Sequence, residues 1–163
     1  MPNLQPILPE SSDQPVRWGG LYGAGLALAV TEASRAHEGP VVVAISNPRQ
    51  LQVLANEVRF FLGETPAHEA MLFPDWETLA YDLFSPHQEI ISARLKLLAE
   101  LPGLEKGIIL TATETLLKRL PPVDYVLGHS FSLKVGEQID IHALRDRLAH
   151  VGYHLVNQVL SQG

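Results

Sequence analysis

The sequence contains no cysteine among its 163 residues. Disulfide bonds and thiolate zinc sites are therefore excluded. No stretch approaches the roughly 18 consecutive apolar residues that predict a membrane-spanning helix. The N-terminus also lacks the basic-then-apolar order of a signal peptide, and its prolines indicate a loose arm over residues 1–20. We expect a cytoplasmic protein with no membrane partner.

Charged residues are also scarce, at 18% of the chain, and the formal net charge is −6. Contacts to nucleic-acid phosphates need clustered Lys and Arg, so this balance argues against a stand-alone nucleic-acid binder. Hydrophobic residues make up 46% of the chain, which is enough for a folded core. The length suits one domain, or one domain with part of a second.

Short apolar runs alternate with helical patterns over most of the chain. Val41–Ile45 has the β-branched composition of a strand buried on both faces of a parallel sheet. The alternation predicts an α/β fold with a parallel sheet covered by helices on both faces. The predicted strands are Val41–Ile45, Ala70–Phe73 and Gly107–Ala112, and the predicted helices are Leu21–His37, Asn47–Leu62, Ser85–Leu101 and Thr113–Leu120.

One of these helices has a clear apolar stripe. Its expected buried positions are Ile90, Ile91, Leu95, Leu97, Leu98 and Leu101.

The pattern changes after Pro121-Pro122. Ser130–Val135 alternates like an edge strand, Ile141–Val151 is predicted to form a helix, and Val156–Leu160 could begin another strand. Such a short stretch makes a poor independent core, so we expect the beginning of a small second α+β domain. The predicted organisation is an arm over 1–20, an α/β domain over 21–122 and a truncated domain over 123–163.

A glycine-rich loop precedes the first predicted helix. Gly20, Gly23 and Gly25 stand where a phosphate-binding loop would have its glycines. A working loop continues with a lysine for the phosphates and a Ser or Thr for magnesium, whereas this chain has Leu26 and Ala27. We interpret the loop as a vestigial nucleotide site whose glycines permit close helix packing. A residual nucleotide-shaped pocket and true ATP turnover are the alternatives.

The segment after the second predicted strand is rich in acids and aromatics. Asp75, Glu77, Asp82 and His87 could suggest a metal or acid–base site, but we favour a solvated turn with helix-capping acids. Trp76, Tyr81 and Phe84 could stack on bases. No Lys or Arg lies between Arg59 and Arg94, which favours a packing role. We predict no catalytic residue and no metal site.

The same segment carries a family resemblance. Asp75–His87 reads DWETLAYDLFSPH, a string that neither composition nor periodicity requires. Together with Val41–Leu62, it resembles the bacterial transcription-repair coupling factors (Mfd), in the module that they share with UvrB. Leu133–Leu148, followed by Gly152-Tyr153, resembles the opening of the domain that both families insert into their first domain.

Two departures make the chain more similar to Mfd than to UvrB. UvrB keeps an intact phosphate loop, whereas this chain has Leu26 and Ala27 there. UvrB also carries a long aromatic hairpin after the second strand, and the interval from Phe73 to Ile90 leaves no room for it.

The resemblance implies a degenerate helicase-like (P-loop NTPase-like) domain followed by the start of a UvrA-binding domain. On that basis we expect an excised N-terminal fragment that acts as a non-catalytic interaction module. It would help to recruit UvrA to stalled RNA polymerase for nucleotide excision repair. Arg145 and Arg147 are the candidate contacts within this chain, although full UvrA binding is expected to need residues after Gly163. Arginines in such positions more often simply form a solvated helix face, and this is the alternative for both.

The resemblance also places the remaining activities elsewhere in the parent protein, an ATP-dependent DNA translocase. ATP and magnesium would bind its motor region, and RNA polymerase and DNA would contact other regions. Two alternatives remain open for this chain. It could be a nucleotide-binding or ATPase domain with an atypical phosphate loop, or a UvrB-like damaged-DNA binder.

Overall fold

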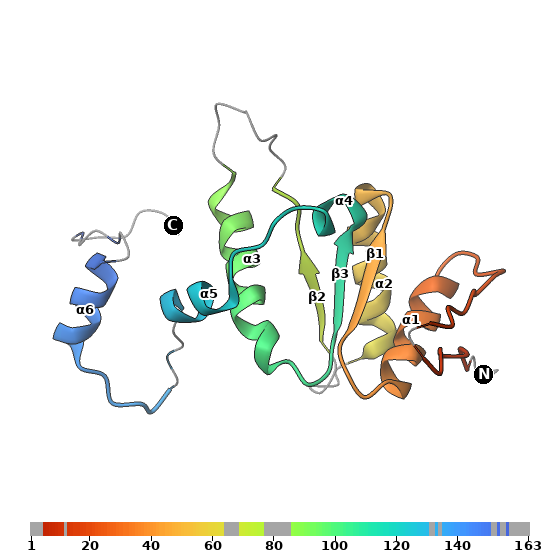
Figure 1. Ribbon diagram of the computed structural model, residues 1–163, viewed down its shortest axis with the longest axis horizontal. Coiled ribbons are helices and arrows are strands. Elements are labelled where there is room, and N and C mark those ends of the chain that lie inside the picture. Colours follow the sequence, from red (N-terminus) through yellow and green to blue (C-terminus); the bar gives the residue numbers. More distant parts are fainter. Residues whose placement is uncertain are drawn as a thin grey trace. The chain divides into compact units, whose positions relative to one another are not determined.

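The computed structural model describes residues 5–11, 13–63, 69–76, 86–130 and 135–150, together with positions 133, 153 and 156. The chain divides into two compact units, Met1–Leu120 and Pro121–Gly163, and each is considered by itself. Helices and strands alternate through the first unit (Figure 1). Its elements are α1 (Gly25–Ala36), β1 (Val41–Ile45), α2 (Leu51–Leu62), β2 (Ala70–Phe73), α3 (Gln88–Glu100), β3 (Ile108–Ala112) and α4 (Thr113–Leu116).

The described strands form one parallel sheet in the order β1-β3-β2. β3 is the central strand, and its first residue, Ile108, is in register with both Val41 of β1 and Ala70 of β2. All five residues of β3 are buried, because the strand has a neighbour on each edge and helices on each face. The predicted α/β fold with a parallel sheet is confirmed.

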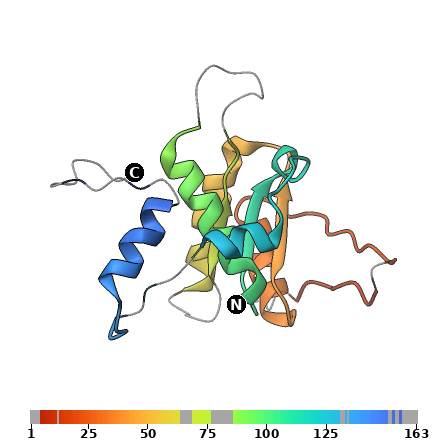
Figure 2. The ribbon, with the colours of Figure 1, turned by 60° about the vertical axis from the view of Figure 1, so that its left-hand side comes forward.

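Helices cover the two faces of the sheet differently. α1 and α2 lie on one face, where Val58 and Leu54 of α2 pack with Leu110 of β3. α3 covers the opposite face, where Leu97 packs with Ile109 of β3 and Phe73 of β2. Figures 1 and 2 show α3 and α2 on opposite sides of the strands. The unit therefore has two apolar layers separated by one sheet.

Local signals in the sequence set several helix boundaries. Asn47 caps the 3-10 turn Pro48–Gln50 that leads into α2, and its side chain accepts a hydrogen bond from the Arg49 amide at 3.1 Å. Gly63, with φ of +67°, ends α2 as predicted. α3 begins later than predicted, because His87 is its N-cap and accepts from the Glu89 amide at 3.4 Å. Ser85, the predicted start, lies outside the described residues.

Two helices of the first unit are shorter than predicted. α1 begins at Gly25 rather than Leu21, because Gly20 and Gly23 adopt positive φ, which a right-handed helix does not. α4 ends at Leu116 rather than Leu120. A 3-10 turn, Leu101–Gly103, follows α3.

The predicted burial of β1 was wrong. Val42 is 55% exposed, because β1 is an edge strand and α3 packs over β2 on this face. Two positions of the predicted stripe on α3, Leu95 and Leu101, are exposed, while Arg94 is buried in their place.

The second unit contains α5 (Val123–His129) and α6 (Ile141–His150). α5 was not predicted, because Pro121-Pro122 was interpreted only as a stop signal. Pro122 is instead the N-cap of a new helix, and its carbonyl accepts a hydrogen bond from the Val126 amide at 3.1 Å.

α6 confirms the predicted helix up to His150. Leu144 and Leu148 are half-buried as expected, whereas Val151 lies outside the described residues. Of the predicted strand Ser130–Val135, the described positions 130, 133 and 135 are not in a strand. Of Val156–Leu160, only Val156 is described, and it is not in a strand.

The core on the α2 face gives a matched test. Val58 is 0% exposed and Val53 is 58% exposed on the same helix. Val58→Ala should lower the free energy of unfolding by about 2 kcal/mol, because buried methyl groups are lost and a cavity remains. Val53→Ala should change it by less than about 0.5 kcal/mol. Urea denaturation measures both, and equal effects would contradict this assignment of the core.

Candidate functional site

The glycine loop before α1 is held by backbone conformation rather than by close packing. Gly20 and Gly23 have φ of +71° and +56°, a region that side chains other than glycine rarely adopt. A Cβ added at either residue would meet none of the described residues within 4 Å, and at Gly25 it would make only an ordinary contact of 3.8 Å with Leu21. The expectation that these glycines permit close helix packing was therefore wrong.

The loop leads into α1 without a polar cap. The Gly25 amide donates to the Tyr22 carbonyl at 3.0 Å, and the N-cap, Ala24, makes no side-chain hydrogen bond. Leu26 is exposed and Ala27 is buried in the core with α2. The two positions thus supply neither the cation nor the hydroxyl that nucleotide binding in such a loop requires.

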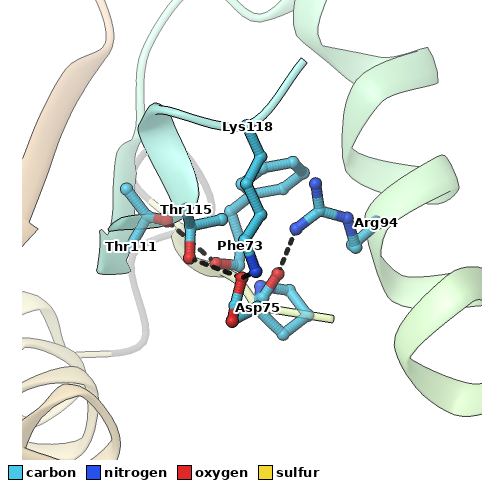
Figure 3. A network of polar contacts seen from close by, with 7 residues as sticks. Phe73, Asp75, Arg94, Thr111, Thr115 and Lys118 are labelled. Atoms are coloured by element: carbon cyan, nitrogen blue, oxygen red, sulfur yellow. Dashed lines mark hydrogen bonds and ion pairs between the residues drawn. The ribbon is translucent and has the colours of Figure 1, made fainter. Parts of the chain in front are cut away.

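A cluster of polar side chains, separate from the glycine loop, lies at the carboxyl ends of β2 and β3 (Figure 3). Asp75, just after β2, accepts hydrogen bonds from Lys118 Nζ at 2.6 Å and Thr115 Oγ1 at 3.2 Å. The Thr111 hydroxyl of β3 donates to the Phe73 carbonyl at 3.0 Å. These bonds tie the end of β2 to β3 and to the segment around α4.

Arg94 joins the same region from α3. Its side chain is almost fully buried, with 1% exposure, and its guanidinium carbon lies 4.1 Å from the centre of the Phe73 ring and 4.2 Å from the centre of the Trp76 ring. Nη1 donates to the Pro74 carbonyl, and Nε has no hydrogen-bond partner among the described residues. The charge is thus compensated by two aromatic faces, one carbonyl and the nearby Asp75.

The ionisation of the cluster follows from these contacts. Burial alone would raise the pKa of Asp75, but hydrogen bonds from Lys118, the Trp76 amide and Thr115, together with the Lys118 charge, hold that pKa below its usual value. Burial lowers the pKa of Arg94, and the charge of Asp75 opposes the shift. At neutral pH both groups are charged, so the cluster is an ionic network.

The expectation of a solvated turn was wrong for Asp75, whose side chain is only 22% exposed and paired with Lys118. His87 does cap a helix, whereas Glu77 and Asp82 lie outside the described residues. The described part of the chain contains no group of three or more His, Cys, Asp or Glu residues that could hold a metal ion.

Trp76 has the packing role that was expected, because it is half-buried and stacks on Arg94. Tyr81 and Phe84, which were grouped with it, lie outside the described residues.

Sequence reasoning missed Arg94, Thr115 and Lys118. The position of Arg94 held a usable signal, because it is a lone charged residue among the apolar positions of α3. Thr115 and Lys118 carried no such signal, since they meet Asp75 only when β2 and β3 are aligned.

The two predicted contact residues lie on α6 in the second unit. Both are exposed, but they differ in their partners. Arg147 Nη2 donates to the Ser130 carbonyl at 3.4 Å, and Arg147 makes a further interaction. Arg145 makes no hydrogen bond or ion pair with another residue of the described set.

Comparison with known proteins finds several relatives that share one name. No protein-family model matches it. It is 36% identical over 156 residues to the transcription-repair-coupling factor of Escherichia coli (strain K12), covering 96% of this chain and 13% of that protein. The Haemophilus influenzae protein of the same name is 38% identical over 160 residues, covering 98% of this chain and 14% of that protein. The Mycobacterium bovis protein of that name is 27% identical over 169 residues.

The helices of the described residues include none that is long and apolar enough to cross a membrane.

Arg94→Ala should lower the free energy of unfolding by about 3 kcal/mol, because Asp75 loses a nearby charge and the Pro74 carbonyl loses its donor. The neighbouring Lys96→Ala removes an exposed charge from the same helix and should change it by less than about 0.5 kcal/mol. Urea denaturation followed by tryptophan fluorescence compares the two. A value below about 1 kcal/mol for Arg94→Ala would show that the buried cation is dispensable.

Proposed function

Nearly the whole chain is homologous to the N-terminal part of the transcription-repair coupling factors, and we propose its function from this homology. The chain spans only 13% to 14% of the length of these two relatives. Within such a protein, it acts as a non-catalytic interaction module that helps to recruit UvrA at stalled RNA polymerase for nucleotide excision repair. The observation that carries this proposal is the 36% to 38% identity over almost every residue of the chain.

The proposed organisation follows the two families that share this module. Residues 21–122 form a degenerate helicase-like domain related to UvrB, preceded by an arm over 1–20. Residues 123–163 are the start of the inserted UvrA-binding domain. The parallel sheet β1-β3-β2 with helices on both faces supports the first part, since helicase-like domains are built in this way.

The glycine loop is proposed to be a vestigial nucleotide site. Gly20 and Gly23 retain the positive φ of a tight loop, but Leu26 and Ala27 follow Gly25. The first lysine of the sequence is Lys96. In the parent protein, ATP and magnesium would bind a separate motor region that drives DNA translocation. RNA polymerase and DNA would likewise contact other regions, in the cytoplasm.

The partner surface within this chain is proposed to include α6. Arg145 is the stronger candidate contact, because it is exposed and has no hydrogen-bonding partner among the described residues. Arg147 is also exposed, but its contact with Ser130 gives it a role in holding α6 to the end of α5. An arginine that is free to pair bidentately with a carboxylate suits an acidic surface on the partner.

Calorimetric titration with UvrA tests the interaction. A chain lengthened by about 60 residues, which brings the second unit to a usual domain size of about 100, should bind, whereas the present chain should bind more weakly or not at all. In the longer chain, Arg145→Ala should weaken binding about fivefold or more, since exposed arginine contacts contribute about 1 kcal/mol or more. Arg49→Ala removes an exposed arginine from the 3-10 turn before α2, and this control should leave the affinity unchanged. If neither chain bound UvrA, the recruitment proposal would fail.

Nucleotide titration tests the vestigial loop. The chain should show no saturable heat with ATP and magnesium up to millimolar concentration, because both the phosphate cation and the metal hydroxyl are missing. The variant Leu26→Lys restores the cation at an exposed position and is the matched comparison. Tight binding of ATP by the unaltered chain would favour the alternative of a nucleotide-dependent domain with an atypical loop.

A further inference from the structure

The connection between the two units is a short, well-delimited segment. The Lys118 amide donates to the Thr115 carbonyl at 3.2 Å just after α4, and the next backbone bond runs from the Val126 amide to the Pro122 carbonyl at the start of α5. Within the described backbone, the amides of residues 119 and 120 donate no hydrogen bond to another backbone group, and residues 121 and 122 are prolines. Arg119–Pro122 is therefore the connector, and the boundary between the units falls inside it.

Few backbone dihedral angles of the connector can rotate freely. Pro121 and Pro122 have fixed φ and no N–H to donate. Leu120 and Pro121 each precede a proline, which restricts their backbone to extended conformations. Arg119 is the one residue of the connector that escapes both restrictions, and it follows Lys118 directly. Rotation of one unit relative to the other is thus concentrated next to Lys118.

Lys118, which directly precedes the connector, is also fixed to the first unit by an ion pair. Its ammonium group lies 2.6 Å from Asp75 Oδ1, and the same carboxylate oxygen accepts from Thr115 at 3.2 Å (Figure 3). The side chains of this ion pair are 22% and 35% exposed, for Asp75 and Lys118 respectively. Asp75 is itself fixed by its neighbours, since Pro74 and Trp76 both contact the buried Arg94.

We propose that Asp75 anchors a hinge between the two units. While the carboxylate holds Lys118 and Thr115, the mobile stretch begins at Arg119 and ends at Pro122. When the contacts of Asp75 with Lys118 and Thr115 are lost, the mobile stretch extends back into α4. The second unit is then attached by a longer and more flexible segment. The inference uses only contacts within the first unit and does not depend on the proposed function.

Limited trypsin digestion of the full chain measures the mobile stretch directly, because trypsin cleaves after Lys118 and Arg119. At low protease concentration the cleavage rate follows the population of the locally opened form. Asp75→Asn should raise the initial rate at these two bonds about three- to tenfold, which lies between the effects of losing an exposed ion pair and a buried charged hydrogen bond. Cleavage after Arg35, in α1, should not change.

The control is Asp124→Asn, which makes the same change of charge on the other side of the connector, in the first turn of α5. It should leave the rate at Lys118 and Arg119 unaltered. Thr115→Val keeps every charge but removes one of the two side-chain contacts to Asp75, and it should raise the rate by a smaller factor. It also keeps the inference testable if Asp75→Asn fails to fold.

Amide hydrogen exchange separates local release from general destabilisation. In Asp75→Asn, the amides of Leu117 and Lys118, which bond to Glu114 and Thr115, should lose protection. Val58→Ala lowers the global stability instead, so it should accelerate exchange in β3 and leave these two amides unaltered. Acceleration of the two amides by Val58→Ala, or an equal increase in cleavage after Arg35 in Asp75→Asn, would mean that the end of α4 opens only by global unfolding and would overturn the hinge. An unchanged rate in both Asp75→Asn and Thr115→Val would overturn it as well.

Discussion

Burial of β3 on both of its faces and both of its edges is the constraint on which the first unit depends. The strand can lose its contact with water only if β1 and β2 supply hydrogen bonds at its edges and helices cover its two sides. α1 and α2 on one face and α3 on the other meet this requirement. The ionic network lies at the carboxyl ends of β2 and β3, and the connector follows α4, which comes directly after β3, so the position of this strand also influences their geometry.

Arg94 shows how a charged residue can specify the packing of a helix. Leucines alone would let α3 slide or rotate over β2 and β3 with little change in free energy, because apolar contacts are not directional. The guanidinium must lie against the rings of Phe73 and Trp76 while reaching the Pro74 carbonyl, and one register of the helix allows this. A buried polar group can in this way fix one arrangement among several of similar stability.

The sequence predicts the regular part of the fold well and the polar cluster poorly. β1 and β2 were placed to the residue, because each is a short apolar run bounded by turn residues. The helix α5 was missed because a double proline marks both the end of one element and the start of the next. The pairing of Asp75 with Thr115 and Lys118 joins residues 40 and 43 positions apart, and no local pattern reports such a contact. The role of the glycines at 20 and 23 was also hidden, since sequence does not distinguish positive φ from close packing.

The strand order has a consequence for how the protein is made. β1 pairs with β3 through residues such as Val41 and Ile108, so among the described strands neither β1 nor β2 meets its partner until β3 has been synthesised. During translation β1 therefore remains unpaired while more than sixty further residues emerge. Strand pairings this distant in sequence form slowly, and until then the unpaired strand can associate with other chains. The nascent protein is thus most exposed to aggregation, and most dependent on chaperones, just before Ile108–Ala112 leaves the ribosome.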